Sequence, residues 1–65
     1  MDIKTIPTTE LKDDLLETLA DIVRCIRALS LGVTEYSGGS TQERLDTNEK
    51  IAANIRAELA RRGES

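Results

Sequence analysis

The segment LKDDLLETLADIVRCIRALS, residues 11–30, decides the fold of this chain. Its main apolar side chains recur at steps of four, four, three, four and three residues, at Leu11, Leu15, Leu19, Ile22, Ile26 and Leu29. This spacing predicts an α-helix with one apolar face and heptad character. Leu16, Val23 and Cys25 widen that face beyond the seam of a two-stranded coiled coil. So wide a face is typical of a bundle in which each helix has two neighbours.

The residues that flank this segment mark the ends of the helix. Thr8 or Thr9 is suited to cap the N-terminus. Gly32 follows the last apolar residue, where a glycine in the left-handed conformation commonly ends a helix. We therefore expect a helix over residues 8–31. Residues 1–7 form an arm that its proline keeps extended, and the two isoleucines of the arm either lie over the apolar face or fray.

A second helix is expected over residues 40–62. Its apolar face is carried by Leu45, Ile51, Ala52, Ile55 and Leu59. Ser40 and Glu43 have the spacing of a capping box, in which each side chain bonds to the backbone N–H of the other residue. Gly63 ends the helix and residues 63–65 form a tail. Two oppositely charged pairs four residues apart add local support: Asp46 with Lys50 and Glu58 with Arg62.

The short connection between the two helices sets the fold class. Only residues 32–39 separate two helices of similar length, which predicts an all-α, antiparallel two-helix hairpin forming a single domain. A β-hairpin in place of the loop is the alternative, with residues 33–36 as one strand, although residues 40–45 lack the alternation of a partner strand.

A lone hairpin leaves part of both apolar faces in water, so we expect self-association into a helical bundle, with a homodimer as the simplest form. Asn48 either fixes the register of that bundle or lies in water at the edge of the face. The expected interface consists of Leu11, Leu15, Leu19, Ile22, Ile26, Leu45, Asn48, Ile51, Ile55 and Leu59.

Composition excludes several classes of function. The chain has 65 residues, a net charge of -3, one cysteine, and no histidine, tryptophan or phenylalanine. Interspersed charges and the lack of an aromatic platform argue against direct binding of nucleic acid. No apolar run approaches the ~20 residues that a membrane span requires, so we expect no membrane partner. A single cysteine without a signal-like segment favours the cytoplasm.

The sequence predicts no enzyme, no cofactor and no metal site. Histidine, the most frequent general base, is absent. Cys25 lies on the apolar face of the first helix, where a structural role is expected because buried thiols are unreactive. Asp13, Glu17 and Asp21 form one helical row that a metal ion would use, but a single row is usually a solvated surface, since hard cations require converging oxygen ligands.

The same row gives a second hypothesis. With Glu10 and Asp14, this row of Asp13, Glu17 and Asp21 makes the outer surface of the first helix negative. A negative helical face is able to occupy a nucleic-acid-binding groove of another protein, and the chain would then inhibit that protein by charge mimicry. The alternative is a solubilising surface without a partner.

The tip of the hairpin is the candidate site for a small anion. Gly38, Gly39 and Ser40 lead into a helix N-terminus, whose free N–H groups attract anions. Tyr36, Arg44 and Arg27 are expected nearby, and together these residues would grip a phosphate, a nucleotide or an acidic partner: Tyr36, Gly38, Gly39, Ser40, Arg44 and Arg27. The structural alternative is a tight loop that leads into a capped helix.

The segments YSGGSTQERL, residues 36–45, and NEKIAANIRAELARR, residues 48–62, carry a resemblance. In them the chain resembles short uncharacterised accessory proteins of tailed bacteriophages and of prophages in enteric bacteria. This resemblance implies a compact, non-enzymatic protein that binds a host protein in the host cytoplasm, with bacterial immunity or a nucleic-acid-processing enzyme as the target. The architecture is also similar to two other phage groups, oligomeric sponges for cyclic nucleotides and head-tail proteins of the virion, which gives two alternative functions.

Overall fold

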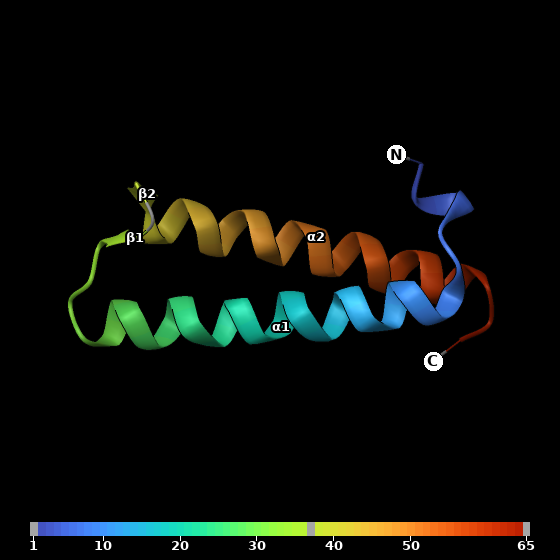
Figure 1. Cartoon of the computed structure of the whole chain (residues 1–65), viewed down its shortest axis with the longest axis horizontal. Coiled ribbons are helices and arrows are strands. Elements are labelled where there is room, and N and C mark those ends of the chain that lie inside the picture. The colour runs from blue at the N-terminus through green and yellow to red at the C-terminus, as the bar shows by residue number, and fades with distance from the viewer. Residues whose placement is uncertain (1, 37, 65) are drawn as a thin grey trace.

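The computed structural model describes residues 2–36 and 38–64, which form an antiparallel helical hairpin (Figure 1). Its elements, in order, are η1 (Ile3–Thr5), α1 (Thr8–Ser30), β1 (Glu35–Tyr36), β2 (Gly39–Ser40) and α2 (Thr41–Arg61). The two long helices lie side by side in one layer, and the extents of the chain are 39 × 22 × 14 Å. The predicted all-α hairpin is confirmed.

Both long helices end in the same glycine motif. Gly32 and Gly63 each have a φ of 82°, which a residue without a Cβ adopts at no steric cost. After α1, the Val33 N–H donates to the Ala28 carbonyl at 2.8 Å; after α2, the Glu64 N–H donates to the Leu59 carbonyl at 2.8 Å. These bonds satisfy carbonyl groups that a helix end otherwise leaves without partners. The prediction that these glycines end the helices is confirmed.

The helix starts agree with the sequence only in part. Ser40 caps α2, because its Oγ accepts a hydrogen bond from the Glu43 N–H at 3.3 Å. Neither predicted threonine caps α1, which begins directly after Pro7 with no side-chain cap. The fixed φ of proline and its carbonyl, which accepts from the Leu11 N–H at 3.0 Å, start this helix instead.

The connection contains a minimal β-ladder that extends from the predicted loop to Ser40, which was predicted as the first residue of the second helix. β1 and β2 pair antiparallel, with Glu35 opposite Ser40 and Tyr36 opposite Gly39. The first strand falls within the range expected for the β-hairpin alternative, but its partner is two residues that come before α2. A ladder of two pairs is too short to produce an alternating pattern in the sequence. Backbone pairing therefore joins residues 35–36 to residues 39–40 directly before α2.

The N-terminal arm is not fully extended as predicted. Ile3–Thr5 form the 3₁₀ turn η1, because the Asp2 carboxylate accepts from the Lys4 N–H at 3.0 Å and caps the turn. Ile3 and Ile6 pack against the core cluster formed by Leu11, Ile55 and Leu59. Of the two alternatives given by the sequence, the structure shows the one in which the isoleucines of the arm lie over the apolar face.

Two rows of side chains on α1, each at heptad spacing, differ in burial. The inner row is buried or half-buried and consists of Leu11, Leu15, Thr18, Ile22, Cys25 and Leu29. The outer row lies one residue further along the chain and consists of Leu16, Leu19, Val23 and Ile26, of which only Leu19 is half-buried. The predicted stripe mixed these rows, because it contained Leu19 and Ile26 but not Thr18. Cys25 lies in the inner row and is 1% exposed, as the structural role predicted for it requires.

Truncating the core should cost much of the stability of this small domain. Leu11 is 1% exposed, so Leu11→Ala is expected to lower the free energy of unfolding by about 2–5 kcal/mol, from the lost burial and the cavity left behind. Leu31→Ala is the matched control, because Leu31 is 76% exposed. Urea denaturation followed by circular dichroism measures both, and equal effects of the two substitutions would contradict this core.

Thr41 makes a second prediction, because its side chain is buried without a polar partner. The residue is 0% exposed, and its Oγ1 has no hydrogen bond within the described part of the chain. Replacing an unsatisfied hydroxyl by a methyl group of the same shape removes a desolvation penalty, so Thr41→Val should stabilise the fold by about 1 kcal/mol. The control is Thr47→Val at an exposed position of α2. Thermal melts compare the two, and destabilisation by Thr41→Val would show that the hydroxyl has a partner in solution.

Candidate functional site

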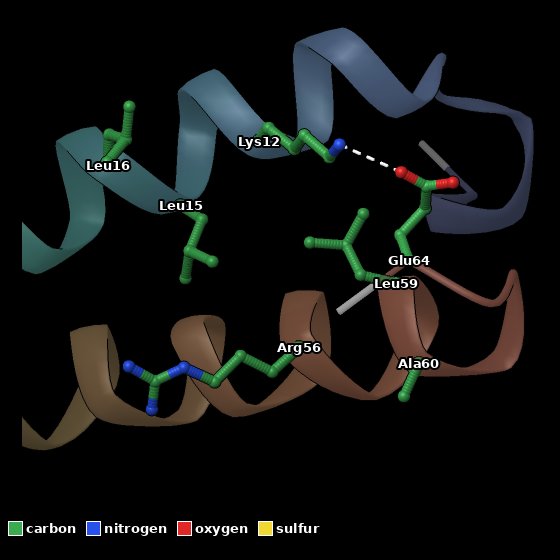
Figure 2. Close-up of a pocket in the computed structure, with 7 residues that line it drawn as sticks. All are labelled: Lys12, Leu15, Leu16, Arg56, Leu59, Ala60 and Glu64. Atoms are coloured by element: carbon green, nitrogen blue, oxygen red, sulfur yellow. Dashed lines mark hydrogen bonds and ion pairs between the residues drawn. The ribbon is translucent and has the colours of Figure 1, made fainter.

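An apolar groove runs between α1 and α2 near the chain ends (Figure 2). Its volume is about 630 Å³, within the range of ligand-binding clefts. The groove is lined by Lys12, Leu15, Leu16, Arg56, Leu59, Ala60 and Glu64. In Figure 2, Leu15 and Leu59 point toward each other across the groove, whereas Leu16 points away from α2. The floor is therefore leucine from both helices.

An ion pair closes one end of the groove. The Lys12 Nζ lies 2.8 Å from Oε1 of Glu64 and joins α1 to the segment that follows α2 (Figure 2). The lysine ammonium lowers the pKa of Glu64 through this hydrogen bond and its charge. The negative charge of Glu64 offsets the positive charge of Lys12, so the pair adds little net charge to the groove.

Arg56 is the second cationic residue of the groove. Its side chain is exposed and extends along α2 beside the leucines (Figure 2). Within residues 2–36 and 38–64 it has no hydrogen bond or ion pair. A guanidinium presents five donors in a fixed fork that fits a carboxylate. The groove thus combines an apolar floor with a guanidinium that has no partner among the described residues.

A buried carboxylate on α2 ties the two ends of the chain together. Glu58 is 6% exposed and accepts from Arg61 Nε at 2.9 Å and from Arg62 Nε at 2.7 Å. Arg62 also donates to Thr8 Oγ1 at 3.0 Å and to the Ile3 carbonyl at 3.2 Å. Hydrogen bonds from the two guanidinium groups hold the pKa of Glu58 at about 2. The pairing of Glu58 with Arg62 expected from the sequence is confirmed.

The predicted acidic face is divided by the fold. Asp21 is paired with Arg24 at 3.3 Å and with Arg44 at 3.7 Å. Asp14 and Glu17 line a second groove, of about 330 Å³, beside the isoleucines of the arm, whereas Asp13 is exposed outside it. Among the described residues, no three His, Cys, Asp or Glu side chains converge as metal ligands. The negative charge is therefore partly neutralised and not gathered into one patch.

The structure brings together four of the six residues predicted at the hairpin tip. Gly38, Gly39, Ser40 and Arg44 line a hollow of about 400 Å³ together with Glu43, Thr47 and Asn48. Arg27 is not among the lining residues. The backbone of Tyr36 belongs to β1, but its side chain lies outside what the structure describes. Arg44 is paired with Asp21, and the Glu43 carboxylate adds negative charge to the hollow.

The predicted interface residues divide by burial within the single chain. Leu11, Leu45, Ile55 and Leu59 are already buried in the hairpin and offer little surface to a second copy. Ile26 and Ile51 are exposed, and the other four are half-buried: Leu15, Leu19, Ile22 and Asn48.

The predicted pair of Asp46 with Lys50 is not found among the described contacts. The carboxylate of Asp46 instead accepts a hydrogen bond from the Gln42 amide at 2.9 Å.

Sequence reasoning did not assign the groove to a site. Lys12, Arg56, Ala60 and Glu64 were absent from every predicted set, although Leu15 and Leu59 were included. Arg56 and Ala60 are four residues apart, as are Lys12 and Leu16, so each pair shares a helix face. Only the register of the hairpin places the two faces together.

Comparisons with known proteins add no assignment to this geometry. The chain matched no protein-family model, no curated protein and no solved structure. In the part of the chain that the structure describes, neither helix combines the length and apolar character needed to cross a membrane.

The Glu58 network predicts how stability depends on pH. The folded pKa of about 2 lies below the ordinary value of 4.5, so the network stabilises the fold above pH 4.5 and this contribution is lost as the pH falls toward 2. Glu58→Gln should be less stable at pH 7 and should lose less stability on acidification than the natural chain. Glu10→Gln, at an exposed position of α1, is the control. Urea unfolding at a series of pH values measures this, and identical slopes for the natural chain and Glu58→Gln would refute the role of the network.

Proposed function

We propose that this chain is a non-enzymatic binding protein whose groove between α1 and α2 receives an acidic, apolar segment of a protein partner. The observation that carries the proposal is the guanidinium of Arg56, which has no partner among residues 2–36 and 38–64 and lies beside an apolar floor. Arginine is enriched among the residues that dominate binding energy at protein interfaces. The partner therefore presents a carboxylate next to leucine-like side chains.

An amphipathic helix fits this description best. Leu15 supplies most of the apolar contact on the floor, because Leu59 across the groove is only 7% exposed. Burial of apolar surface contributes about 25 cal/mol per Å². A helix that lies in a groove places anchors three and four residues apart on one face, so a carboxylate one turn from an apolar anchor is able to reach Arg56. A bidentate bond from the guanidinium would then fix the register of the partner.

The finer proposal is a phage-type accessory protein that inhibits a host protein of bacterial immunity or of nucleic-acid processing in the host cytoplasm. Its support is the resemblance of residues 36–45 and 48–62 to proteins of tailed phages and prophages. The absence of histidine and the burial of Cys25 support a role without catalysis.

Binding of a nucleotide or another anion at the hairpin tip has weaker support. Arg44 is engaged by Asp21, and the Glu43 carboxylate lines the same hollow. The first N–H groups of α2 have no partner within the helix. One of them, the N–H of Glu43, already donates to the Ser40 hydroxyl. An anion there would meet a carboxylate and would compete for donors that already have partners.

The test is capture of a partner by matched charge-reversal variants. The natural chain, Arg56→Glu and Lys50→Glu are used as baits in lysate of a bacterial host. Both substitutions change the charge by the same amount at exposed positions of α2, but only Arg56 lines the groove. The natural chain and Lys50→Glu should recover the same stoichiometric protein, and Arg56→Glu should weaken that binding by about tenfold or more.

Two outcomes would contradict the proposal. One is the recovery of no stoichiometric protein by the natural chain. The other is a partner that binds Arg56→Glu as tightly as it binds the natural chain, which would place recognition elsewhere. Circular dichroism of each bait confirms that the helices are intact before the comparison is made.

A further inference from the structure

The outer row of α1 is an apolar surface that the hairpin does not cover. Leu16, Val23 and Ile26 are 66%, 55% and 51% exposed, and Leu19 between them is half-buried. The steps between them are three, four and three residues, which is the spacing of a coiled-coil seam. The inner row beside it has the same spacing and already packs within the hairpin. α1 therefore carries two seams and uses one of them.

Charges of opposite sign occupy the two ends of this surface. The N-terminal half of α1 carries four acidic residues and one cation, Lys12, which is paired with Glu64. The C-terminal half carries Arg24 and Arg27 and one acidic residue, Asp21, which is paired with Arg24. The N-terminal half is therefore net negative and the C-terminal half net positive.

Arg27 directly follows Ile26, and Asp13 lies three residues before Leu16. The two are fourteen residues apart, which is two full heptads, so both lie on the same flank of the outer row. Both are exposed, and neither has an ion-pair partner among the described residues.

We propose that the outer row is the seam of a homodimer in which α1 of one copy packs antiparallel to α1 of the other. Antiparallel pairing layers Leu16 against Ile26 of the partner subunit and Leu19 against Val23 of the partner subunit. It also brings Asp13 beside Arg27 of the partner subunit, twice by symmetry. A parallel pairing would instead set the acidic half of each helix against its copy, where like charges repel.

The surface area of the chain agrees with a missing partner. A compact monomer of 7.2 kDa is expected to expose about 4,100 Å². This chain exposes 4694 Å², an excess of roughly 600 Å². A stable interface takes about 600–1,000 Å² from each copy. Covering the outer row by a second copy would bring the exposed area close to that of a compact protein.

The dimer and the proposed partner site are separate surfaces except at Leu16. Arg56, Leu59 and Ala60 lie on α2, so a second copy on α1 leaves that wall of the groove uncovered. The dimer does not rest on the proposed function. A variant that loses dimerisation can still be tested for partner binding, and a variant that loses partner binding can still be tested for dimerisation.

Two valines provide a matched test of the seam. Val23 is 55% and Val33 is 42% exposed, but only Val23 belongs to the outer row. Analytical ultracentrifugation over a concentration series should show a dimer for the natural chain and for Val33→Glu. Val23→Glu places two carboxylates at the centre of the seam and should raise the dissociation constant by about a hundredfold or more. Circular dichroism checks that the helices of both variants remain folded.

A charge swap tests the antiparallel direction. Asp13→Arg or Arg27→Asp alone turns two attractions into two repulsions and should raise the dissociation constant roughly tenfold. The double variant should return it to the natural value. Within one chain the two residues are about 21 Å apart along α1, so rescue requires contact between copies. Effects on the helix dipole would add in the double variant and would not cancel.

A natural chain that stays monomeric throughout the series would overturn the proposal. So would a dimer that is unaffected by Val23→Glu, because its interface would then lie elsewhere. A double charge variant that remains as weak as the single variants would overturn the antiparallel arrangement.

Discussion

Two helices in one layer bury too little of their own apolar surface, and the rest of this structure depends on that constraint. The core has Leu11, Ile55 and Leu59 at its centre, with the arm packed on it through Ile3 and Ile6. A larger bundle gives each helix two neighbours. Here α1 has one long neighbour, so a second row of apolar side chains and a groove between the helices remain open.

The buried carboxylate of Glu58 holds this thin core closed at the end where the groove lies. Through Arg62 it connects the C-terminus of α2 with the start of α1 and with the arm. A buried carboxylate is stable only when paired and hydrogen-bonded, and two guanidinium groups meet that requirement. The ion pair of Lys12 with Glu64 acts on the other side of the same end. Both grooves beside the core are therefore bounded by segments that these polar contacts fix in place.

The errors of the sequence analysis have a common physical origin. Leu19 and Ile26 are as apolar as the residues that the hairpin buries, so composition could not show that Thr18 belongs to the inner row and that Ile26 does not. The two rows differ by a rotation of about 100° around the helix axis. The groove was missed for a similar reason, since Arg56 has no local feature that separates it from the other surface arginines. The small β-ladder was too short to leave a pattern.

What the amino-acid sequence determined by itself is local: two helices, their ends at Gly32 and Gly63, the cap at Ser40, and a connection short enough to require an antiparallel hairpin. These features follow from hydrogen bonds and backbone angles within a few residues of each position. Tertiary structure alone decided which row of α1 was buried and which residues of α2 came to face Leu15 and Lys12. A helix forms equally well whichever way it is turned about its axis. The buried face is therefore set by side-chain packing between segments that are far apart in the chain.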